Sequence, residues 1–335
     1  METDPVRGEG EQLDLLDGTV SVVVVSYFTG PLLWRCLAAA LAQPEVRDVV
    51  VVDNGNWDRT RDDLALMAEA DDRVHVVTGQ GNVGFAAGCN LGVAAASGEV
   101  IFILNPDAIL APGAVATLLR EGRRYGGRGA WLIGGRLLNP DGTVQAGARR
   151  GALTPWTALV EMTRLYRVAP RHPYFRRFNQ HGEPEPDGTV PMPVISGACM
   201  MMPRETYEAV GGMDEAYFLH VEDVDFCVRV GAAGGKVLYT PKAEVTHYKS
   251  SSRANRFRIE QLKAHSLHLY FRRHFSGVYP PGFLTLVSAV SWGGVGLRMA
   301  KLTAQRTIGL TGVGRRSGAR GGVRAARVTG RAAER

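Results

Sequence analysis

Short, nearly uninterrupted runs of β-branched residues recur along the first part of the chain. The runs and the helix-like segments between them occupy residues 20–27, 31–41, 49–52, 62–70, 74–77, 86–96 and 100–104. A run of this kind fits a strand that is covered on both faces. Strands that alternate with helices at this spacing predict right-handed βαβ units, and therefore an α/β fold with a doubly wound, mostly parallel sheet flanked by helices.

Polar residues stand where these runs end. In a doubly wound sheet, ligands bind where the carboxyl ends of the strands pass into loops. The first candidates for a functional site are therefore Tyr27, Asp53, Asn82 and Asp107.

The segment Gly79–Gly84 matches G-x-G-x-x-G, follows a predicted strand and precedes a predicted helix. In dinucleotide-binding enzymes with this pattern, the glycines follow the first strand and an acidic residue ends the second. Here the acidic strand end, Asp53, precedes the glycines instead. The order disfavours an NAD-dependent oxidoreductase, which stays open as an alternative.

Asp53 begins the sequence Asp-Asn-Gly, which is also a strong turn signal. By itself it fits a turn cap as well as a ligand-binding carboxylate. Its neighbours on the loops and at the next helix start are Asn54, Asn82, Gly84 and Asn90. Amides and carboxylates supply directional hydrogen bonds and glycines let the backbone approach a ligand, so the group favours a pocket for a base and a ribose.

Asn105-Pro106-Asp107 follows the apolar run 100–104. A carboxylate there fits Mg²⁺ or Mn²⁺ bound against a diphosphate, because phosphates and water supply the other ligands. The alternative is that Asp107 caps a helix in the segment 108–125.

Three acids stand within four residues in Glu222-Asp223-Val224-Asp225, at a predicted helix start. Carboxylates favour helix N-termini, so part of the cluster fits capping alone. Three acids exceed what capping requires, and one of them fits a general base that takes a proton from an acceptor hydroxyl.

His247 ends the strand-like EVTH and is followed by Lys249 and three serines. A lone histidine is more often structural than a ligand. This position after a strand, with a cation and hydroxyls beside it, nevertheless fits a site for metal and phosphate.

The cysteines and the N-terminal residues indicate the cellular compartment of the protein. The cysteines are scattered, form no C-x-x-C pair and are expected to be reduced and mostly buried: Cys36, Cys89, Cys199 and Cys227. Residues 1–18 are polar and acidic, without the basic start and apolar stretch of a signal peptide, and are expected to be flexible. We therefore expect a cytoplasmic protein.

The C-terminal region suggests attachment to a membrane surface. The apolar stretch 283–297 is shorter than the roughly 20 residues that cross a bilayer, so we expect amphipathic interfacial helices over 276–300. Residues 298–335 hold ten Lys or Arg and one Glu, although the net charge of the whole chain is +6. The tail 301–335 is expected to be disordered, and either contacts anionic lipid on the inner face of the plasma membrane or has no partner.

Residues 151–193 break the alternation with a Pro-rich, aromatic and basic stretch. Interleaved arginines and aromatic rings are also found in nucleic-acid surfaces. No recognised binding motif accompanies them, so we expect no nucleic-acid partner and interpret the stretch as a variable insertion that faces an acceptor or a membrane.

Five blocks, over about residues 19–275, together resemble the family 2 inverting glycosyltransferases of GT-A fold, and most of all their rhamnosyltransferase branch. The blocks are VSVVVVSYFTG, VVVVDNGNWDRT, GNVGFAAGCNLGVAAASGEVIFILNPDA, ISGACMMMPRETYEAVGGMDEAYFLHVEDVDFCVRV and KVLYTPKAEVTHYKSSS. The resemblance implies a divalent cation and transfer of L-rhamnose from dTDP-rhamnose to a polyprenyl-diphosphate-linked saccharide in cell-wall or surface polysaccharide assembly.

By the same resemblance, Asp223 is the catalytic base of an E-D pair with Glu222. Asp107 is the remaining acid of a D-x-D metal motif, and His247 completes the metal site. The nucleotide-sugar pocket is formed by Tyr27, Asp53, Asn54, Asn82, Gly84, Asn90, Asn105 and Asp107. Val221 departs from the family pattern, in which glycine is common before the E-D pair. An inactive sugar-nucleotide-binding scaffold stays open as the alternative, as does a homo-oligomer.

Overall fold

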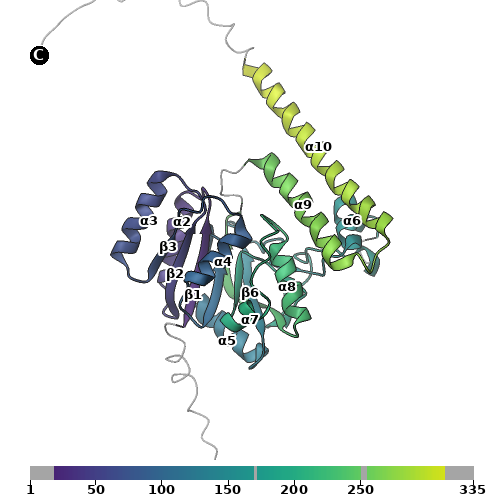
Figure 1. The fold of residues 1–335 in the computed structure, drawn as a ribbon. Helices are drawn as coiled ribbons and strands as arrows, with labels where there is room; N and C mark the ends of the chain where they lie inside the picture. Colours follow the sequence, from purple (N-terminus) through teal and green to yellow (C-terminus); the bar gives the residue numbers. More distant parts are fainter. Residues whose placement is uncertain (1–18, 170–171, 250–254, 314–335) are drawn as a thin grey trace, which may run out of the picture. The chain divides into compact units, whose positions relative to one another are not determined.

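A nine-stranded sheet is the centre of the fold within residues 19–169, 172–249 and 255–313, which the computed structural model describes. Its strand order is β3-β2-β1-β4-β10-β6-β11-β5, and β8 pairs with β11. Figure 1 shows β3, β2 and β1 side by side in the N-terminal, purple part of the sheet. The strands are β1 Val20–Ser26, β2 Val46–Asp53, β3 Val74–Val77, β4 Val100–Leu104, β5 Ala108–Leu110, β6 Trp131–Leu138, β8 Val190–Pro191, β10 Cys199–Pro203 and β11 Lys236–His247. A separate two-stranded sheet consists of β7 Arg149–Arg150 and β9 Val194–Ile195.

The strands β1 to β4 are parallel, because crossover helices join them. These helices are α2 Pro31–Leu41, α3 Asp58–Ala70 and α4 Phe85–Ala95. β6 and β11 are also parallel, whereas β10 runs antiparallel between β4 and β6. The predicted α/β fold with a largely parallel sheet is confirmed, with antiparallel strands added in its second half.

Two glycines let α4 lie directly against β1. All residues of β1 are buried. A Cβ atom added at Gly92 would lie 2.3 Å from Cγ1 of Val23, and one added at Gly88 would lie 2.8 Å from Cγ1 of Val25. Because nothing larger than hydrogen fits at these positions, the helix packs closely and holds the loop 79–84 at the carboxyl edge of the sheet.

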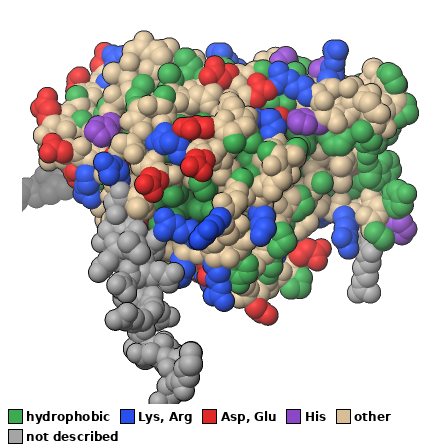
Figure 2. Space-filling view, turned by 60° about the horizontal axis from the view of Figure 1, so that its bottom comes forward, with side chains coloured by type: hydrophobic (Ala, Val, Ile, Leu, Met, Phe, Trp, Pro, Cys, Tyr) green, Lys and Arg blue, Asp and Glu red, His purple; other side chains and the backbone are tan. Residues whose placement is uncertain are grey.

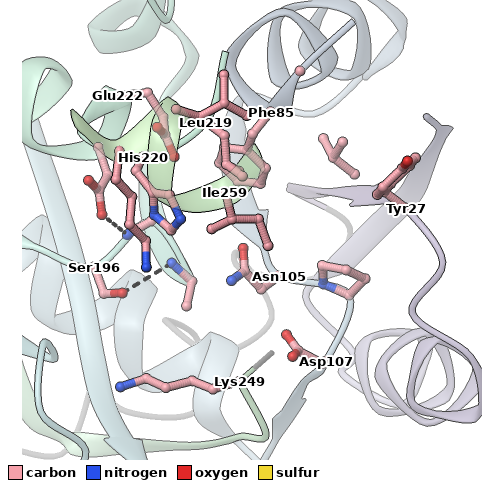
Figure 3. A pocket seen from close by; sticks show the side chains of 18 of the residues that line it. Tyr27, Phe85, Asn105, Asp107, Ser196, Leu219, His220, Glu222, Lys249 and Ile259 are labelled. Atoms are coloured by element: carbon pink, nitrogen blue, oxygen red, sulfur yellow. Dashed lines mark hydrogen bonds between the residues drawn. The ribbon is translucent and has the colours of Figure 1, made fainter. Parts of the chain in front are cut away.

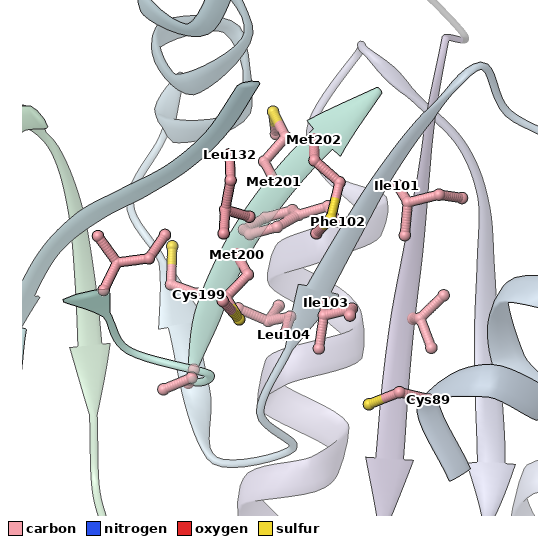
Figure 4. Close-up of a cluster of buried hydrophobic side chains, with 14 of the residues drawn as sticks. Cys89, Ile101, Phe102, Ile103, Leu104, Leu132, Cys199, Met200, Met201 and Met202 are labelled. Carbon is pink, nitrogen blue, oxygen red and sulfur yellow. The ribbon is translucent and has the colours of Figure 1, made fainter. Parts of the chain in front are cut away.

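Three consecutive methionines of β10 fill the middle of the core (Figure 4). Met200, Met201 and Met202 are fully buried. Met201 lies opposite Phe102 of β4 on one side and Ile133 of β6 on the other. This packing holds the strand that directly follows the turn 196–198. The four cysteines are also buried and free, as expected.

Six further α-helices follow β5 within the described residues. They are α5 Ala114–Gly126, α6 Pro155–Thr163, α7 Arg204–Ala209, α8 Glu222–Ala232, α9 Arg256–Phe275 and α10 Pro281–Val313. The insertion 151–193 contains α6 and the short 3₁₀ helices η1 Leu165–Arg167 and η2 Pro173–Phe175. Figure 2 shows basic and acidic side chains interspersed over the face in view.

The strand β5 was not predicted. The helix expected near 112–125 is present as α5, but no strand was expected between Asp107 and that helix. Ala108–Leu110 instead pairs antiparallel with the end of β11. The reading of Asp107 as a helix cap is therefore wrong. A three-residue strand is too short to show a period of its own in the sequence.

The apolar part of the C-terminal helix α10 is longer than the stretch 283–297 identified in the sequence. Within α10, the stretch Pro281–Ala300 has 20 residues and is long and apolar enough to cross a membrane, by length and composition only. The helix continues to Val313, so the first part of the tail that was expected to be disordered is helical. Residues 1–18 and 314–335, which we expected to be flexible or disordered, lie outside the described residues.

The chain divides into two compact units. The first ends at Trp292 and the second begins at Gly293.

Candidate active site

A cavity of about 610 Å³ opens at the carboxyl ends of β1, β2 and β4 (Figure 3). The loop before α4, the turn 196–198, the start of α8 and one side of α9 complete its walls. Most of the predicted site residues line it, namely Tyr27, Asn54, Asn82, Gly84, Asn105, Asp107, Glu222, Asp223 and His247. The carboxylates of Asp107 and Asp223, far apart in the chain, thus share one cavity.

Asp107 and His247 meet because β5 pairs with β11. The pairing sets Ala108 opposite His247, and the backbone N–H of Tyr248 donates to the carbonyl of Asp107 at 3.1 Å. The Oδ1 atom of Asp107 lies 3.1 Å from Nε2 of His247. The amide nitrogen of Asn105 lies 3.2 Å from the same ring atom. A carboxylate and an imidazole therefore face each other in a buried corner.

This corner fits a divalent cation. Carboxylate oxygen and unprotonated imidazole nitrogen are both common ligands of divalent metals. Among the described residues, no group of three or more His, Cys, Asp or Glu side chains is arranged to hold a metal ion. With Asp107 and His247 as its protein ligands, a cation in this corner would need its remaining ligands from a bound molecule or from water.

Asp223 lies in the first turn of α8 and is held by several donors. Its Oδ2 accepts from the backbone N–H of Gly197 at 2.9 Å and from the guanidinium of Arg150. Burial by itself raises the pKa of Asp223, but the charge and hydrogen bond of Arg150 outweigh it and lower the pKa below the usual range. The carboxylate is therefore ionised at neutral pH, as a general base must be.

Glu222 offers the opposite protonation state. It is buried, and its Oε2 atom has no hydrogen-bond partner among the described residues. Burial and the neighbouring charge of Asp223 raise the pKa of Glu222. A protonated carboxyl on the cavity wall can donate a hydrogen bond to a hydroxyl of a ligand.

The backbone before α8 is strained. His220 has φ 68° and Val221 has φ 73°, in the left-handed region. Such a conformation costs roughly 1–2 kcal/mol per non-glycine residue. The turn brings His220 to the cavity wall, where burial lowers its pKa to about 4 and keeps the ring neutral. At Val221 the chain thus has a β-branched residue where glycine would relieve the strain.

Side-chain amides shape the loop that carries Asn82 and Gly84. The Asn54 amide donates to Asn82 Oδ1 at 3.2 Å and to the carbonyl of Gly84 at 3.1 Å, and it accepts from the backbone N–H of Val83 at 3.0 Å. Gly84 has φ +92°, and a Cβ atom there would lie 2.6 Å from the carbonyl oxygen of Phe218. This wall is consequently polar and closely packed.

Asp53 and Asn90 do not line the cavity. Asp53 accepts from the backbone and side chain of Asn56, each at 2.8 Å, and from the hydroxyl of Thr78 at 2.8 Å. Asn90 instead donates to the carbonyl of Met213 at 2.9 Å and to Glu215 at 2.8 Å. In this structure Asp53 connects the loop after β2 to the loop after β3, and Asn90 connects α4 to the segment 213–215.

Sequence reasoning missed several polar residues at the site. Arg150 contacts Asp223, Gln145 contacts His247, and Arg258 and Lys263 of α9 line the cavity. Arg150 lies at the edge of the irregular insertion and Gln145 in the loop between β6 and β7, where no period or motif distinguishes them. Lys249 was predicted only to lie beside His247, and it also lines the cavity.

Comparisons with known proteins find relatives over most of this chain. The model of glycosyl transferase family 2 matches residues 21–211, and that of the N-terminal domain of galactosyltransferase matches residues 180–253. The N-acetylglucosaminyl-diphospho-decaprenol L-rhamnosyltransferase of Mycobacterium tuberculosis is 32% identical over 279 residues, which cover 76% of this chain and 85% of that protein.

Solved structures show a similar fold. GalNAc-T7 with UDP, GalNAc and Mn²⁺ superposes with a TM-score of 0.56 at 18% identity, over 76% of this chain and 48% of that chain. The mannosyltransferase PcManGT of Pyrobaculum calidifontis, in complex with GDP-Man and Mn²⁺, has a TM-score of 0.52 at 15% identity, over 89% and 79% of the two chains.

The fold is thus the GT-A fold expected from the sequence, and the protein is a glycosyltransferase. More narrowly, the chain belongs to glycosyl transferase family 2, whose model spans more than half of it.

Proposed function

We propose that this chain is an inverting, metal-dependent rhamnosyltransferase. It would move L-rhamnose from dTDP-rhamnose to a hydroxyl of a polyprenyl-diphosphate-linked saccharide, for the assembly of a cell-wall or surface polysaccharide. The similarity to the mycobacterial rhamnosyltransferase supports the choice of sugar and acceptor. The observation that carries the catalytic proposal is the single cavity lined by Asp107, His247 and Asp223.

Asp223 acts as general base in the proposed reaction. It takes the proton of the acceptor hydroxyl while the hydroxyl oxygen bonds to the anomeric carbon of the donor sugar. The bond from that carbon to the diphosphate breaks, and the nucleoside diphosphate leaves with the bonding electrons. Because attack comes from the face opposite the leaving group, the configuration of the anomeric carbon inverts.

Asp107 and His247 would hold a divalent cation, which supplies charge neutralisation for the departing diphosphate. We expect Mn²⁺ to serve better than Mg²⁺, because Mg²⁺ strongly prefers oxygen ligands and one ligand here is an imidazole. Tyr27, Asn54 and the loop that carries Asn82 and Gly84 would contact the nucleoside. Glu222, as a protonated carboxyl, would donate to a hydroxyl of the donor sugar.

The test is transfer by the purified full chain with Mn²⁺, dTDP-rhamnose and polyprenyl-diphosphate GlcNAc, followed as release of dTDP and as product mass. We expect Asp223→Asn to lower kcat by about 10²- to 10⁴-fold, the usual contribution of a general base. The variant should also melt at a lower temperature, because it removes the charged partner of Arg150, so kcat is compared at a temperature where both proteins are folded. Asp187→Asn, at an exposed acid outside the cavity, should retain full activity.

An inactive scaffold predicts a different result. Such a protein would bind dTDP-rhamnose, as seen by a thermal shift, but release no dTDP in the presence of metal and acceptor. Binding without turnover by the wild-type chain would therefore overturn the proposed activity.

We also propose that the protein acts at the inner face of the plasma membrane, with α10 as its contact. The apolar stretch Pro281–Ala300 supports this, since an acceptor carried on a polyprenyl chain remains in the membrane.

A further inference from the structure

Gln145 binds both the ring and the backbone of His247. The Oε1 atom of Gln145 lies 2.7 Å from Nδ1 of His247, and its Nε2 donates to the carbonyl oxygen of His247 at 2.8 Å. The same Nε2 donates to Oδ1 of Asn139 at 3.1 Å. Gln145 is 1% exposed. One buried amide thus holds the histidine at two points.

A short hairpin after β6 brings Gln145 to this position. Leu138 pairs with Val144, and the backbone N–H of Asn139 donates to the carbonyl of Thr143 at 2.8 Å. The backbone N–H of Gln145 then donates to the carbonyl of Leu137 at 2.8 Å. Since β6 and β11 are parallel neighbours, the side chain that follows this turn reaches the end of β11.

The contacts determine which end of the amide faces the ring. A backbone carbonyl only accepts, so the atom that binds the carbonyl of His247 must be the NH₂ group of Gln145. The oxygen of the amide therefore faces Nδ1, and it also only accepts. Consequently Nδ1 carries the ring proton, and in the neutral ring Nε2 presents its lone pair toward Asp107 and the amide of Asn105.

We propose that Gln145 is a positioning residue of the metal corner, which selects the Nδ1–H tautomer of His247 and aims its Nε2 lone pair at the place shared with Asp107. The inference rests on the proposed metal-dependent function. It adds a residue that does not line the cavity and touches neither donor nor acceptor, and that acts only through His247.

The first test measures Mn²⁺ affinity of the full chain in the presence of dTDP, from the signal of free Mn²⁺ in electron paramagnetic resonance. Gln145→Met removes both hydrogen bonds to His247, and the one to Asn139, at nearly unchanged volume. It should weaken Mn²⁺ binding about 10- to 100-fold, as is usual for residues behind a metal ligand. Gln145→Glu retains an acceptor facing Nδ1 and should restore most of the affinity.

A matched control separates this role from a general loss of packing. Gln43 is also a buried glutamine that donates to two backbone carbonyls, of Ala39 at 3.3 Å and Ala111 at 3.2 Å, but it does not contact His247. Gln43→Met should leave Mn²⁺ affinity unchanged. In a His247→Ala background, Gln145→Met should have no further effect, because the two residues act as one unit.

Nitrogen NMR of the histidine rings gives an independent readout. At a pH where the ring is neutral, the signal that disappears in His247→Ala should show the proton on Nδ1 and none on Nε2 in the wild-type chain. A neutral ring with its proton on Nε2, unchanged Mn²⁺ affinity in Gln145→Met, an equal loss in the His247→Ala background, or no Mn²⁺ binding by the wild-type chain with dTDP would each overturn the inference. Mn²⁺ binding is read without sugar transfer, so a wrong sugar or acceptor would defeat the proposed function and leave this result standing.

Discussion

Arg150 determines the charge environment of the predicted base. Its guanidinium donates to Asp223 and to the carbonyl of Ile195, and it lies 5.6 Å from the centre of the Phe178 ring. The side chain is only 12% exposed, so solvent screens the ion pair weakly. A cation held this close favours the ionised form of Asp223, which explains how a buried carboxyl keeps its charge.

Arg150→Met should therefore shift the acidic limb of the pH profile of kcat/KM to higher pH. Without the cation, burial dominates and the pKa of Asp223 rises, so the base is protonated over a wider acidic range. The stability that comes from the lowered pKa, present above the unfolded value and lost as pH falls through the folded one, should also decrease. Arg150→Lys keeps the charge and should shift the limb less. An unmoved limb in Arg150→Met would contradict the role given to Asp223.

The close approach of α4 to β1 depends on glycine at position 92. Gly92 lies where an added Cβ would be 2.3 Å from Val23 and 3.1 Å from Cγ2 of Val52, in two strands whose valines are fully buried. Neither valine can move without displacing the sheet, because the core is closely packed.

Gly92→Ala should destabilise the protein by about 1–3 kcal/mol, the usual cost of overpacking a core, despite the better helix propensity of alanine. Gly231, in α8, has no atom within 4 Å of an added Cβ, and Gly231→Ala should be neutral or stabilising by up to about 1 kcal/mol. Urea unfolding of the two variants measures both values. Equal stability of the two would show that α4 can move away from the sheet.

The start of α10 combines an anchored side with an exposed apolar side. Val287 is fully buried in the core cluster, whereas Leu286 is 51% exposed and Trp292 is 44% exposed. Exposed leucine and tryptophan on an apolar helix are typical of a surface that contacts a membrane.

The variant Leu286→Glu/Trp292→Glu should sediment less with vesicles that contain anionic lipid than the wild-type chain does, since each glutamate adds a charge to the contacting surface. Leu66, 63% exposed in α3, supplies the control: Leu66→Glu should not change vesicle binding. Activity on a water-soluble acceptor analogue should remain in all three proteins. Unchanged vesicle binding of the double variant would rule out this helix face as the membrane contact.

Residues at strand ends could be predicted, because strand position alone places them at one edge of the sheet. Asp107 and His247 were found in this way, and so was Asp53 as a strand-end residue. The direction of the Asp53 side chain could not be predicted. It depends on Asn56 and Thr78, which donate hydrogen bonds to its two carboxylate oxygens. Arg150 and Gln145 were not found, because a two-residue strand and a loop show no period in the sequence and reach the site only after folding.

The amino-acid sequence by itself determined the α/β class, the position of most helices and strands, and the acids that follow β4 and begin α8, because these follow from local periodicity and from how strands end. Tertiary structure alone decided the pairing of β5 with β11, the glycine-dependent approach of α4, and the contacts of Arg150 with Asp223 and of Gln145 with His247. The reason is physical: a hydrogen bond or an ion pair between residues far apart in the chain depends on distances that exist only once the core has packed, and no local pattern in the sequence encodes them.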